Sequence, residues 1–170
     1  MGIIEELKSK LGLKPHPGEG GFFVETYRSA ETLSLGDLGR SPAGRRSVGT
    51  AIYYLITPDS FSAMHRLTSD EIFHFYLGDP VEMLLLAPDG SGRTVLLGNR
   101  IMDGMSPQVV VPAHYWQGSR LQPGGQFALL GTTVAPGFDF ADFEVGKRSL
   151  LAGAYPAFRD RIHQLTAGPA

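Results

Sequence analysis

The chain has 170 residues, of which 42% are hydrophobic, and its formal net charge is −2. This length is enough for one domain with a proper core, so we expect a single domain over residues 1–170. No run of Lys and Arg stands out, which makes nucleic acid and anionic membranes poor candidates as partners. The chain contains no cysteine, which excludes disulfides, zinc ribbons and thiol nucleophiles.

The chain begins Met-Gly-Ile-Ile-Glu-Glu, which has neither the basic region nor the apolar region of a signal peptide. No apolar run approaches the roughly 20 residues that a membrane-spanning helix needs. We therefore expect a cytoplasmic protein with no membrane partner.

In chain order, the first predicted element is a short helix over residues 3–12, where apolar residues recur at helical spacing. Pro15 and Pro17 prevent this helix from continuing. Residues 22–29 predict a strand. Residues 30–47 are rich in glycine and predict a surface loop that is either mobile or a lid over a site.

From residue 50 onward, short apolar segments alternate with turns that contain glycine or proline, and residues 155–165 predict a closing helix. The predicted strands cover residues 50–57, 61–67, 71–77, 81–87, 93–97, 108–111 and 126–134. Because no long helix separates them, these strands cannot form a parallel βαβ sheet. We expect an all-β antiparallel sandwich or jelly-roll barrel with a short N-terminal helix and a C-terminal helical segment.

Two predicted neighbouring strands contain the strongest candidates for a site, His65 and Glu71. Side chains alternate along a strand, so His65 shares a face with Leu67, and Glu71 shares a face with Phe73 and Phe75. If these faces line the barrel interior, one imidazole and one carboxylate meet in an apolar pocket. Small-molecule sites usually have this composition. A lone histidine beside a strand is, however, more often a surface residue or a satisfied core residue.

The spacing of these residues is similar to a known motif. His65, Glu71 and, after six further residues, Gly78 resemble the first motif of the cupin superfamily, His-x-His-x(3–4)-Glu-x(6)-Gly. Leu67 stands where that motif has its second histidine. A second cupin motif is matched at Pro112, and Gln117 stands at its histidine position.

The chain as a whole resembles the cupin-5-like subfamily, a domain family of unknown function, from about residue 11 to 156. The resemblance rests on residues 16–29, 69–78, 111–112, 116–117 and 131–144. His114 departs from the family pattern, because a glycine is expected there. The resemblance implies a double-stranded β-helix jelly roll (the cupin barrel), usually a homodimer, related in shape to deoxysugar epimerases and other sugar-nucleotide cupins.

Cupins usually bind a metal with three histidines and one glutamate. This chain keeps His65 and Glu71 and offers Gln117 as a weak oxygen ligand. That set is small for tight binding of a transition metal, which commonly uses at least three good ligands. We therefore expect either no required cofactor or one divalent transition metal bound by His65, Glu71 and Gln117.

The first functional hypothesis is a metal-independent epimerase or isomerase. Its substrate would be a small polar metabolite, such as a carbohydrate, a sugar-nucleotide-like compound or a keto acid. His65 would act as the base, and Glu71 would orient it or carry a second proton. Tyr27 or Tyr76 would protonate the opposite face if either reaches the cavity. Arg28 could bind a carboxylate or phosphate, although a salt bridge with Glu25 explains it equally well.

Two further hypotheses stay open. In a binding protein without catalysis, aromatic side chains would stack on a sugar ring or nucleobase. In a metal-dependent cupin, the same site would serve a dioxygenase or isomerase. The catalytic candidates are His65 and Glu71, and the ligand-binding candidates are Glu25, Tyr27, Arg28, Phe73, Phe75, Trp116 and Gln117. His74, Tyr76 and His114 receive no firm role from the sequence.

Overall fold

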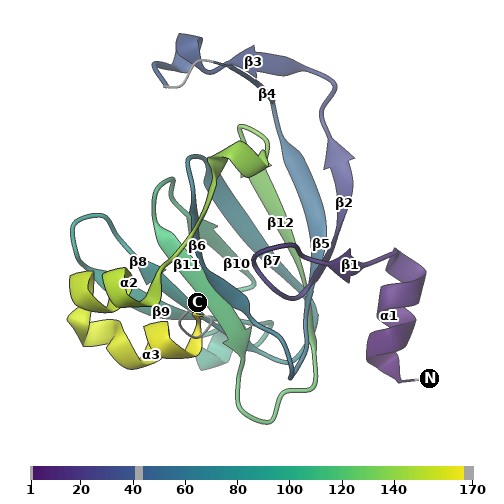
Figure 1. The fold of residues 1–170 in the computed structure, drawn as a ribbon. Coiled ribbons are helices and arrows are strands. Elements are labelled where there is room, and N and C mark those ends of the chain that lie inside the picture. The colour runs from purple at the N-terminus through teal and green to yellow at the C-terminus, as the bar shows by residue number, and fades with distance from the viewer. Residues whose placement is uncertain (1, 41–43, 167–170) are drawn as a thin grey trace.

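The structure is a computed structural model that describes residues 2–40 and 44–166. Two antiparallel β-sheets face each other and form a jelly-roll barrel (Figure 1). The first sheet has six strands: β1 (Lys14–Pro15), β2 (Phe22–Arg28), β5 (Thr50–Ile56), β12 (Ala128–Ala135), β7 (Asp70–Gly78) and β10 (Gln108–Val111), in spatial order. The second sheet has five strands: β13 (Phe143–Val145), β6 (Ser62–Leu67), β11 (Trp116–Leu121), β8 (Val81–Leu86) and β9 (Gly92–Leu97).

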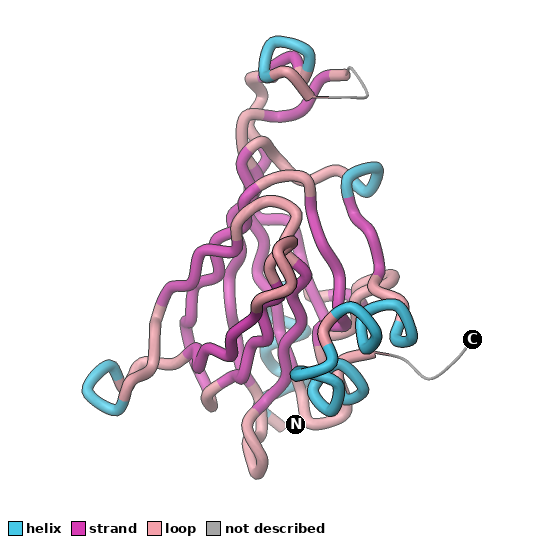
Figure 2. Tube along the Cα trace, turned by 90° about the vertical axis from the view of Figure 1, so that its left-hand side faces the viewer, coloured by secondary structure: helices cyan, strands magenta, loops and turns pink. Residues whose placement is uncertain are grey.

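Short helices and one small hairpin complete the fold. The α-helices are α1 (Ile3–Leu11), α2 (Arg148–Ala154) and α3 (Arg159–Gln164). The 3-10 helices are η1 (Gly36–Leu38), η2 (Ile101–Asp103), η3 (Phe140–Asp142) and η4 (Pro156–Phe158). The hairpin of β3 (Thr32–Ser34) and β4 (Arg45–Ser47) stands above the barrel in both views (Figures 1 and 2). None of the helices among the described residues is long and apolar enough to cross a membrane.

The main core lies between the two sheets. Phe73 and Leu130 from the six-stranded sheet pack with Met83 and Leu85 from the five-stranded sheet, and all four side chains are buried. Burying side chains of this size contributes roughly 1.5–3 kcal/mol each. This core holds together the two sheets between which the site is built.

Both sheets are also covered in part on their outer faces. Helices α2 and α3 pack on the five-stranded sheet, where Leu151 and Ile162 contact Leu84 and Leu86 of β8. Helix α1 packs on the six-stranded sheet through its apolar side. Strand β8 is thus buried on both faces from Met83 to Leu86, which is why these four residues form a continuous apolar run rather than an alternating pattern.

The predicted fold class is confirmed, with its N-terminal helix and C-terminal helical segment. Residues 30–47, predicted as a loop, instead contain β3, η1 and β4, and residues 41–43 lie outside the described part. The predicted closing helix is divided into η4 and α3. Strand β11 and helix α2 were not predicted, because β11 is short and polar for a strand and α2 has only seven residues.

The backbone conformation of two turns explains why Gly78 and His114 stand at their positions in the motifs. Gly78 has φ +102°, and a Cβ there would overlap the carbonyl oxygen of Phe127, so only glycine fits. His114 lies in the turn between β10 and β11 with φ +69°. It therefore adopts the left-handed conformation that a glycine would take at this position.

Candidate functional site

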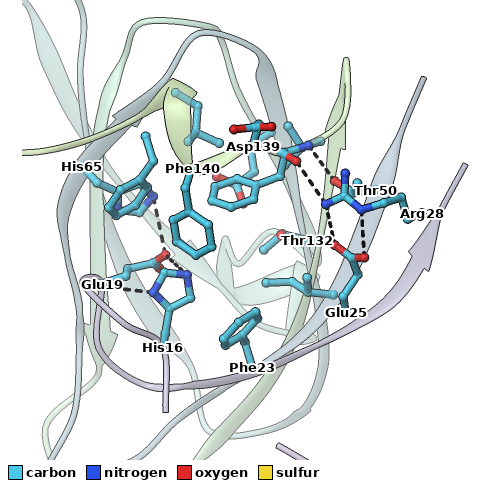
Figure 3. Close-up of a pocket in the computed structure, with 16 residues that line it drawn as sticks. His16, Glu19, Phe23, Glu25, Arg28, Thr50, His65, Thr132, Asp139 and Phe140 are labelled. Carbon is cyan, nitrogen blue, oxygen red and sulfur yellow. Dashed lines mark hydrogen bonds and ion pairs between the residues drawn. The ribbon is translucent and has the colours of Figure 1, made fainter. Parts of the chain in front are cut away.

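A cavity of about 300 Å³ is lined in part by Arg28 and Thr50, which lie just before and after the β3–β4 hairpin, so it lies at the end of the barrel from which that hairpin projects (Figure 3). Its lining comes from β2, β5, β6, β7 and β12, from the loop before β2 and from the segment after β12. This volume is at the lower end of the roughly 300–1,000 Å³ typical of small-molecule pockets. A molecule the size of one sugar ring would be enclosed, whereas a sugar nucleotide would extend beyond the mouth.

His65 is held in one orientation at the inner wall of the cavity. It lies on β6, is only 2% exposed, and its Nδ1 is 2.7 Å from the carbonyl oxygen of Ala63. A carbonyl oxygen can only accept a hydrogen bond, so Nδ1 must be the nitrogen that bears hydrogen. In the neutral ring, Nε2 is therefore unprotonated and available as a base.

Glu19 lies between two imidazole rings (Figure 3). Its Oε2 is 3.9 Å from Nε2 of His65 and 3.7 Å from Nε2 of His16. Its Oε1 accepts a hydrogen bond of 2.5 Å from the Ser62 hydroxyl. Burial lowers the pKa of His16, so this ring stays neutral near pH 7. A proton taken up by His65 would face the Glu19 carboxylate, which would stabilise the resulting imidazolium.

The loop that carries His16 and Glu19 is fixed by two glycines. Gly20 and Gly21 have φ values of +95° and +67°. A Cβ on Gly21 would lie 2.7 Å from the hydroxyl oxygen of Tyr54, and that hydroxyl donates a 2.8 Å hydrogen bond to the carbonyl oxygen of Gly20. Only glycines allow the loop to approach the buried tyrosine this closely.

Glu71 is the second acid–base group of the cavity. It is buried on β7, and its Oε2 accepts a 2.7 Å hydrogen bond from Nε2 of Gln117. Burial raises the pKa of the Glu71 carboxyl, and the nearby His65 partly offsets this effect. The carboxyl therefore keeps its proton to a higher pH than an exposed glutamate. Gln117 reaches it because β11 pairs with β6 so that Gln117 lies opposite His65.

The donors at this position do not fit a tightly bound transition metal. Across residues 2–40 and 44–166, no group of three or more His, Cys, Asp or Glu side chains could hold a metal ion. Leu67 lines the cavity where the motif has a histidine, and Gln117 directs its amide nitrogen at Glu71. One imidazole, one carboxyl with a raised pKa and one amide are a poor set for such an ion.

An ion pair stands on the opposite side of the cavity (Figure 3). On β2, Arg28 donates hydrogen bonds to Glu25 from Nε at 2.9 Å and from Nη2 at 2.7 Å. Nη2 also donates to the carbonyl oxygen of Phe138 at 3.1 Å. The hydrogen bond with Glu25 raises the pKa of Arg28. Arg28 is therefore salt-bridged as well as being part of the cavity wall.

Phenylalanines form the apolar side of the cavity. Phe138, Phe140 and Phe143 follow β12, and we call these three residues the aromatic roof. Their rings pack edge to face, with centroids 5.0 Å apart for Phe138 and Phe140 and 6.3 Å apart for Phe140 and Phe143. The Phe143 ring also stacks on His65, with centroids 5.2 Å apart.

Four of the aromatic candidates do not line this cavity. Phe73 is buried in the core between the sheets, and Phe75 packs against that core. Both lie farther along β7 than Glu71, so they share its face but fill the closed part of the barrel. Trp116 precedes Gln117 and so points to the opposite face, where it packs with α2 and α3. Tyr27 is 58% exposed and follows an irregularity in the register of β2.

The unassigned residues also lie outside the cavity lining. Tyr76 is exposed, and the His74 ring stacks on it with centroids 6.3 Å apart. His74 Nε2 is 3.1 Å from the Thr133 hydroxyl on the neighbouring strand. These side chains belong to the outer face of the six-stranded sheet, as alternation from Glu71 predicts.

Sequence reasoning gave no role to several residues that the structure brings to the cavity. These are His16, Glu19, Phe23, Thr50 and Thr132. For His16 and Glu19, the sequence offered one indication of a role, namely that both stand shortly before the Gly20–Gly21 pair. Nothing in the local pattern shows that this loop crosses to β6.

The chain is similar to several proteins of unassigned function. A hypothetical protein from Leishmania major is 33% identical, with a TM-score of 0.87 over 96% of this chain and 98% of that chain. Protein SO0799 from Shewanella oneidensis is 31% identical, with a TM-score of 0.86 over 99% and 100% of the two chains. Uncharacterized protein YML079W of Saccharomyces cerevisiae is 34% identical over 132 residues, which are 73% of this chain. The chain spans 66% of that yeast relative, just under two thirds of its length.

Oxalate decarboxylase from Bacillus subtilis is a more distant neighbour, at 10% identity and a TM-score of 0.52 over 92% of this chain and 38% of that chain. This likeness shows the fold alone. Residues 5–146 match the family described as Cupin superfamily (DUF985). The resemblance seen in the motifs is thereby confirmed, and the chain belongs to the Cupin_5 family.

Proposed function

We propose that this cupin binds a small polar, carbohydrate-like molecule in its cavity and moves a proton on it without a metal, as an epimerase or isomerase does. The observation that carries the proposal is the fixed tautomer of His65. The Ala63 carbonyl holds hydrogen on Nδ1, so the neutral ring offers the Nε2 lone pair as a base. Glu19 faces Nε2 at 3.9 Å and stabilises the charge that forms when the base takes up a proton.

Glu71 supplies the matching acid. Burial raises the pKa of the Glu71 carboxyl, which favours its protonated form as a proton donor. His65 would remove a proton from the carbon beside a carbonyl, and the electron pair would move to the carbonyl oxygen, which takes the proton of Glu71. The product of this step is an enediol. His65 then delivers its proton to the former carbonyl carbon while the hydroxyl on the other carbon gives its proton to Glu71 and becomes the new carbonyl, which completes the isomerisation and restores both groups.

The walls of the cavity suit a carbohydrate. The aromatic roof offers apolar ring faces on which a sugar ring packs, and the opposite walls contain Thr50 and Thr132 as hydrogen-bonding groups. The apolar roof also shields the reacting groups from water, which strengthens the electrostatic contacts of His65 and Glu71.

The experiment is proton exchange from heavy water into a panel of aldoses and ketoses, followed by NMR. We expect exchange at the carbon beside the carbonyl, lowered about 100-fold or more in His65→Gln, which removes the base. His74→Gln is the matched control, because His74 lies on the outer face of the sheet and should leave exchange unchanged. Equal rates of deuterium exchange in His65→Gln and in the parent would contradict the proposal.

Binding without chemistry is the second candidate function. The aromatic roof favours it, since ring stacking on a ligand needs no proton transfer. A saturable change in the NMR spectrum of the chain on adding a sugar, with no exchange of deuterium into that sugar, would identify this case.

A homodimer is part of the same proposal. Tyr76 on β7 and Val110, which lies opposite Ile72 on the neighbouring strand β10, are exposed apolar side chains on the outer face of the six-stranded sheet. Exposed apolar residues on one sheet face mark a surface that another chain can cover. Light scattering after size exclusion should give twice the 18.4 kDa chain mass, and Tyr76→Glu should shift the mass toward the monomer.

A further inference from the structure

The described residues that line the cavity include more acidic than basic side chains. Three carboxyl groups belong to Glu19, Glu25 and Asp139, a fourth belongs to Glu71, whose raised pKa favours the neutral form, and the one guanidinium or ammonium group belongs to Arg28. An anionic ligand would therefore meet a site with an excess of carboxyl groups.

Arg28 does not offset the negative charge of these carboxylates, because its guanidinium is already paired within the chain. Its Nε and Nη2 donate to Glu25, and Nη2 donates as well to the Phe138 carbonyl. The pair of Arg28 and Glu25 is close to neutral as a unit. Nη1 is the only one of its nitrogens without a hydrogen bond to another described residue.

Asp139 has no ion-pair partner among the described residues, and the basic groups that face Glu19 are imidazoles, with no Lys or Arg among its ion pairs. Glu19 faces two imidazoles, at 3.7 and 3.9 Å, and that of His16 is kept neutral by burial. Asp139 accepts a 2.8 Å hydrogen bond from the backbone N–H of Ala141 and makes no ion pair within the described ranges. Arg28 and Arg46 lie close enough to feel its charge, but their bidentate hydrogen bonds go to Glu25 and Asp142.

The phenylalanines of the cavity also favour a cationic ligand. Phe140 lies between the two carboxylates (Figure 3), and Phe23 and the other two residues of the aromatic roof line the same cavity. The face of an aromatic ring carries partial negative charge and attracts a cation within about 6 Å, more strongly where water is excluded. Carboxylates together with ring faces form a site for an organic ammonium group.

We propose that the ligand of this cavity carries a cationic nitrogen, as in a small hydroxylated amine, placed between the aromatic roof and the carboxylates of Glu19 and Asp139. This inference rests on the proposed function in one respect, that the cavity is the ligand site. It selects among the substrate classes of that function: keto acids and sugar nucleotides, which are anions, are disfavoured, and amino sugars and related amines are favoured.

Three compounds of nearly equal shape isolate the effect of charge: choline, the neutral 3,3-dimethylbutan-1-ol and the anion 3,3-dimethylbutanoate. NMR titration of the full chain should show choline binding about tenfold more tightly than the neutral compound, with the anion weakest. Asp139→Asn keeps the acceptor for Ala141 and removes the charge, and Glu19→Gln removes the other charge. Each should lower the choline affinity about tenfold and leave the neutral compound unchanged.

Asp103→Asn is the control, because it removes one carboxylate from an exposed pair with Arg100 outside the cavity lining, and it should have no effect. Equal affinity for the three compounds, tightest binding of the anion, no binding of any of them, or choline affinity unchanged in both cavity variants would each overturn the inference. A different result would contradict the proposed function. Deuterium exchange that persists in His65→Gln would contradict proton transfer by His65, but it would not affect the inference that the ligand is a cation.

Discussion

The two ends of the barrel interior are built from the same strands but have opposite chemistry. Along β7, Glu71 lies at the cavity and accepts a hydrogen bond from Gln117, whereas Phe73, two residues farther on, is 1% exposed in the apolar core. Burying a carboxyl group and an amide costs free energy that burying a phenylalanine recovers. The closed end therefore stabilises the fold, whereas the polar groups buried at the open end lower its stability.

Hydrogen bonding inside the barrel is also incomplete. Gln117 Oε1 and Ser119 Oγ are buried and have no hydrogen-bond partner among the described residues. Both belong to β11, where Gln117 contacts Glu71 of the cavity and Ser119 lies opposite Met83. A fold selected for stability alone would pair or remove such groups.

The largest expected effect breaks the closed end. Phe73→Ala should lower the free energy of unfolding by about 3–5 kcal/mol, because the core cannot collapse fully around the missing ring. Phe140→Ala is the matched substitution at the open end, and since Phe140 is 53% exposed it should cost within about 1 kcal/mol. Urea denaturation measures both, and equal costs would contradict the division of the barrel into two ends.

The next effect concerns the glycine at the far end of β7. Gly78→Ala should cost about 3 kcal/mol, because the added Cβ overlaps the Phe127 carbonyl and the backbone has positive φ. Gly90→Ala, also at positive φ but with nothing within 4 Å of its Cβ, should cost only about 1–2 kcal/mol. Denaturation midpoints of the two variants separate steric overlap from backbone strain, and a smaller loss for Gly78→Ala would contradict this account.

A smaller effect sharpens the picture of the open end. Burial raises the pKa of Glu71 in the folded chain above its ordinary value of 4.5. Its contribution to the free energy of unfolding is therefore full below pH 4.5 and is lost as the pH rises through the raised pKa, by on the order of 1 kcal/mol for each pKa unit.

Urea denaturation of the parent and of Glu71→Gln across pH 4 to 8 measures this term, because the variant lacks the titration. The stability of the parent should decline relative to that of the variant as the pH rises. A decline as the pH falls would mean that the Glu71 pKa is lowered in the folded chain.

The smallest expected effect is on metal content. Elemental mass spectrometry of untagged chain, purified without a metal column, should give less than about 0.1 equivalent of any transition metal, because the donor set of His65, Glu71 and Gln117 is poor. Glu71→Ala should give the same value. Near one equivalent in the parent and none in the variant would restore the metal-dependent hypothesis.

Local patterns in the sequence carry a large part of the fold. Alternation along the strands predicts that His65, Leu67 and Glu71 share the interior, and all three line the cavity. Alternation has a period of two residues wherever the chain is extended, so it can be followed without knowledge of the partner strands. It does not show where along a strand the interior changes from open cavity to closed core, which is why Phe73 and Phe75 were expected in the site.

The sequence by itself determined the all-β antiparallel class and the strands that contain His65 and Glu71, because these depend on neighbouring residues, and its resemblance to cupins implied the jelly roll. Only the tertiary structure decided which groups meet: Glu19 reaches His65 across 46 positions, and Gln117 reaches Glu71 across 46 as well. Such contacts come from the pairing of distant strands and the packing of loops over them, and no local period encodes them. The ion pair of Arg28 with Glu25 lies between these cases, since the partners are three positions apart in the chain and an irregularity in the register of β2 lies between them.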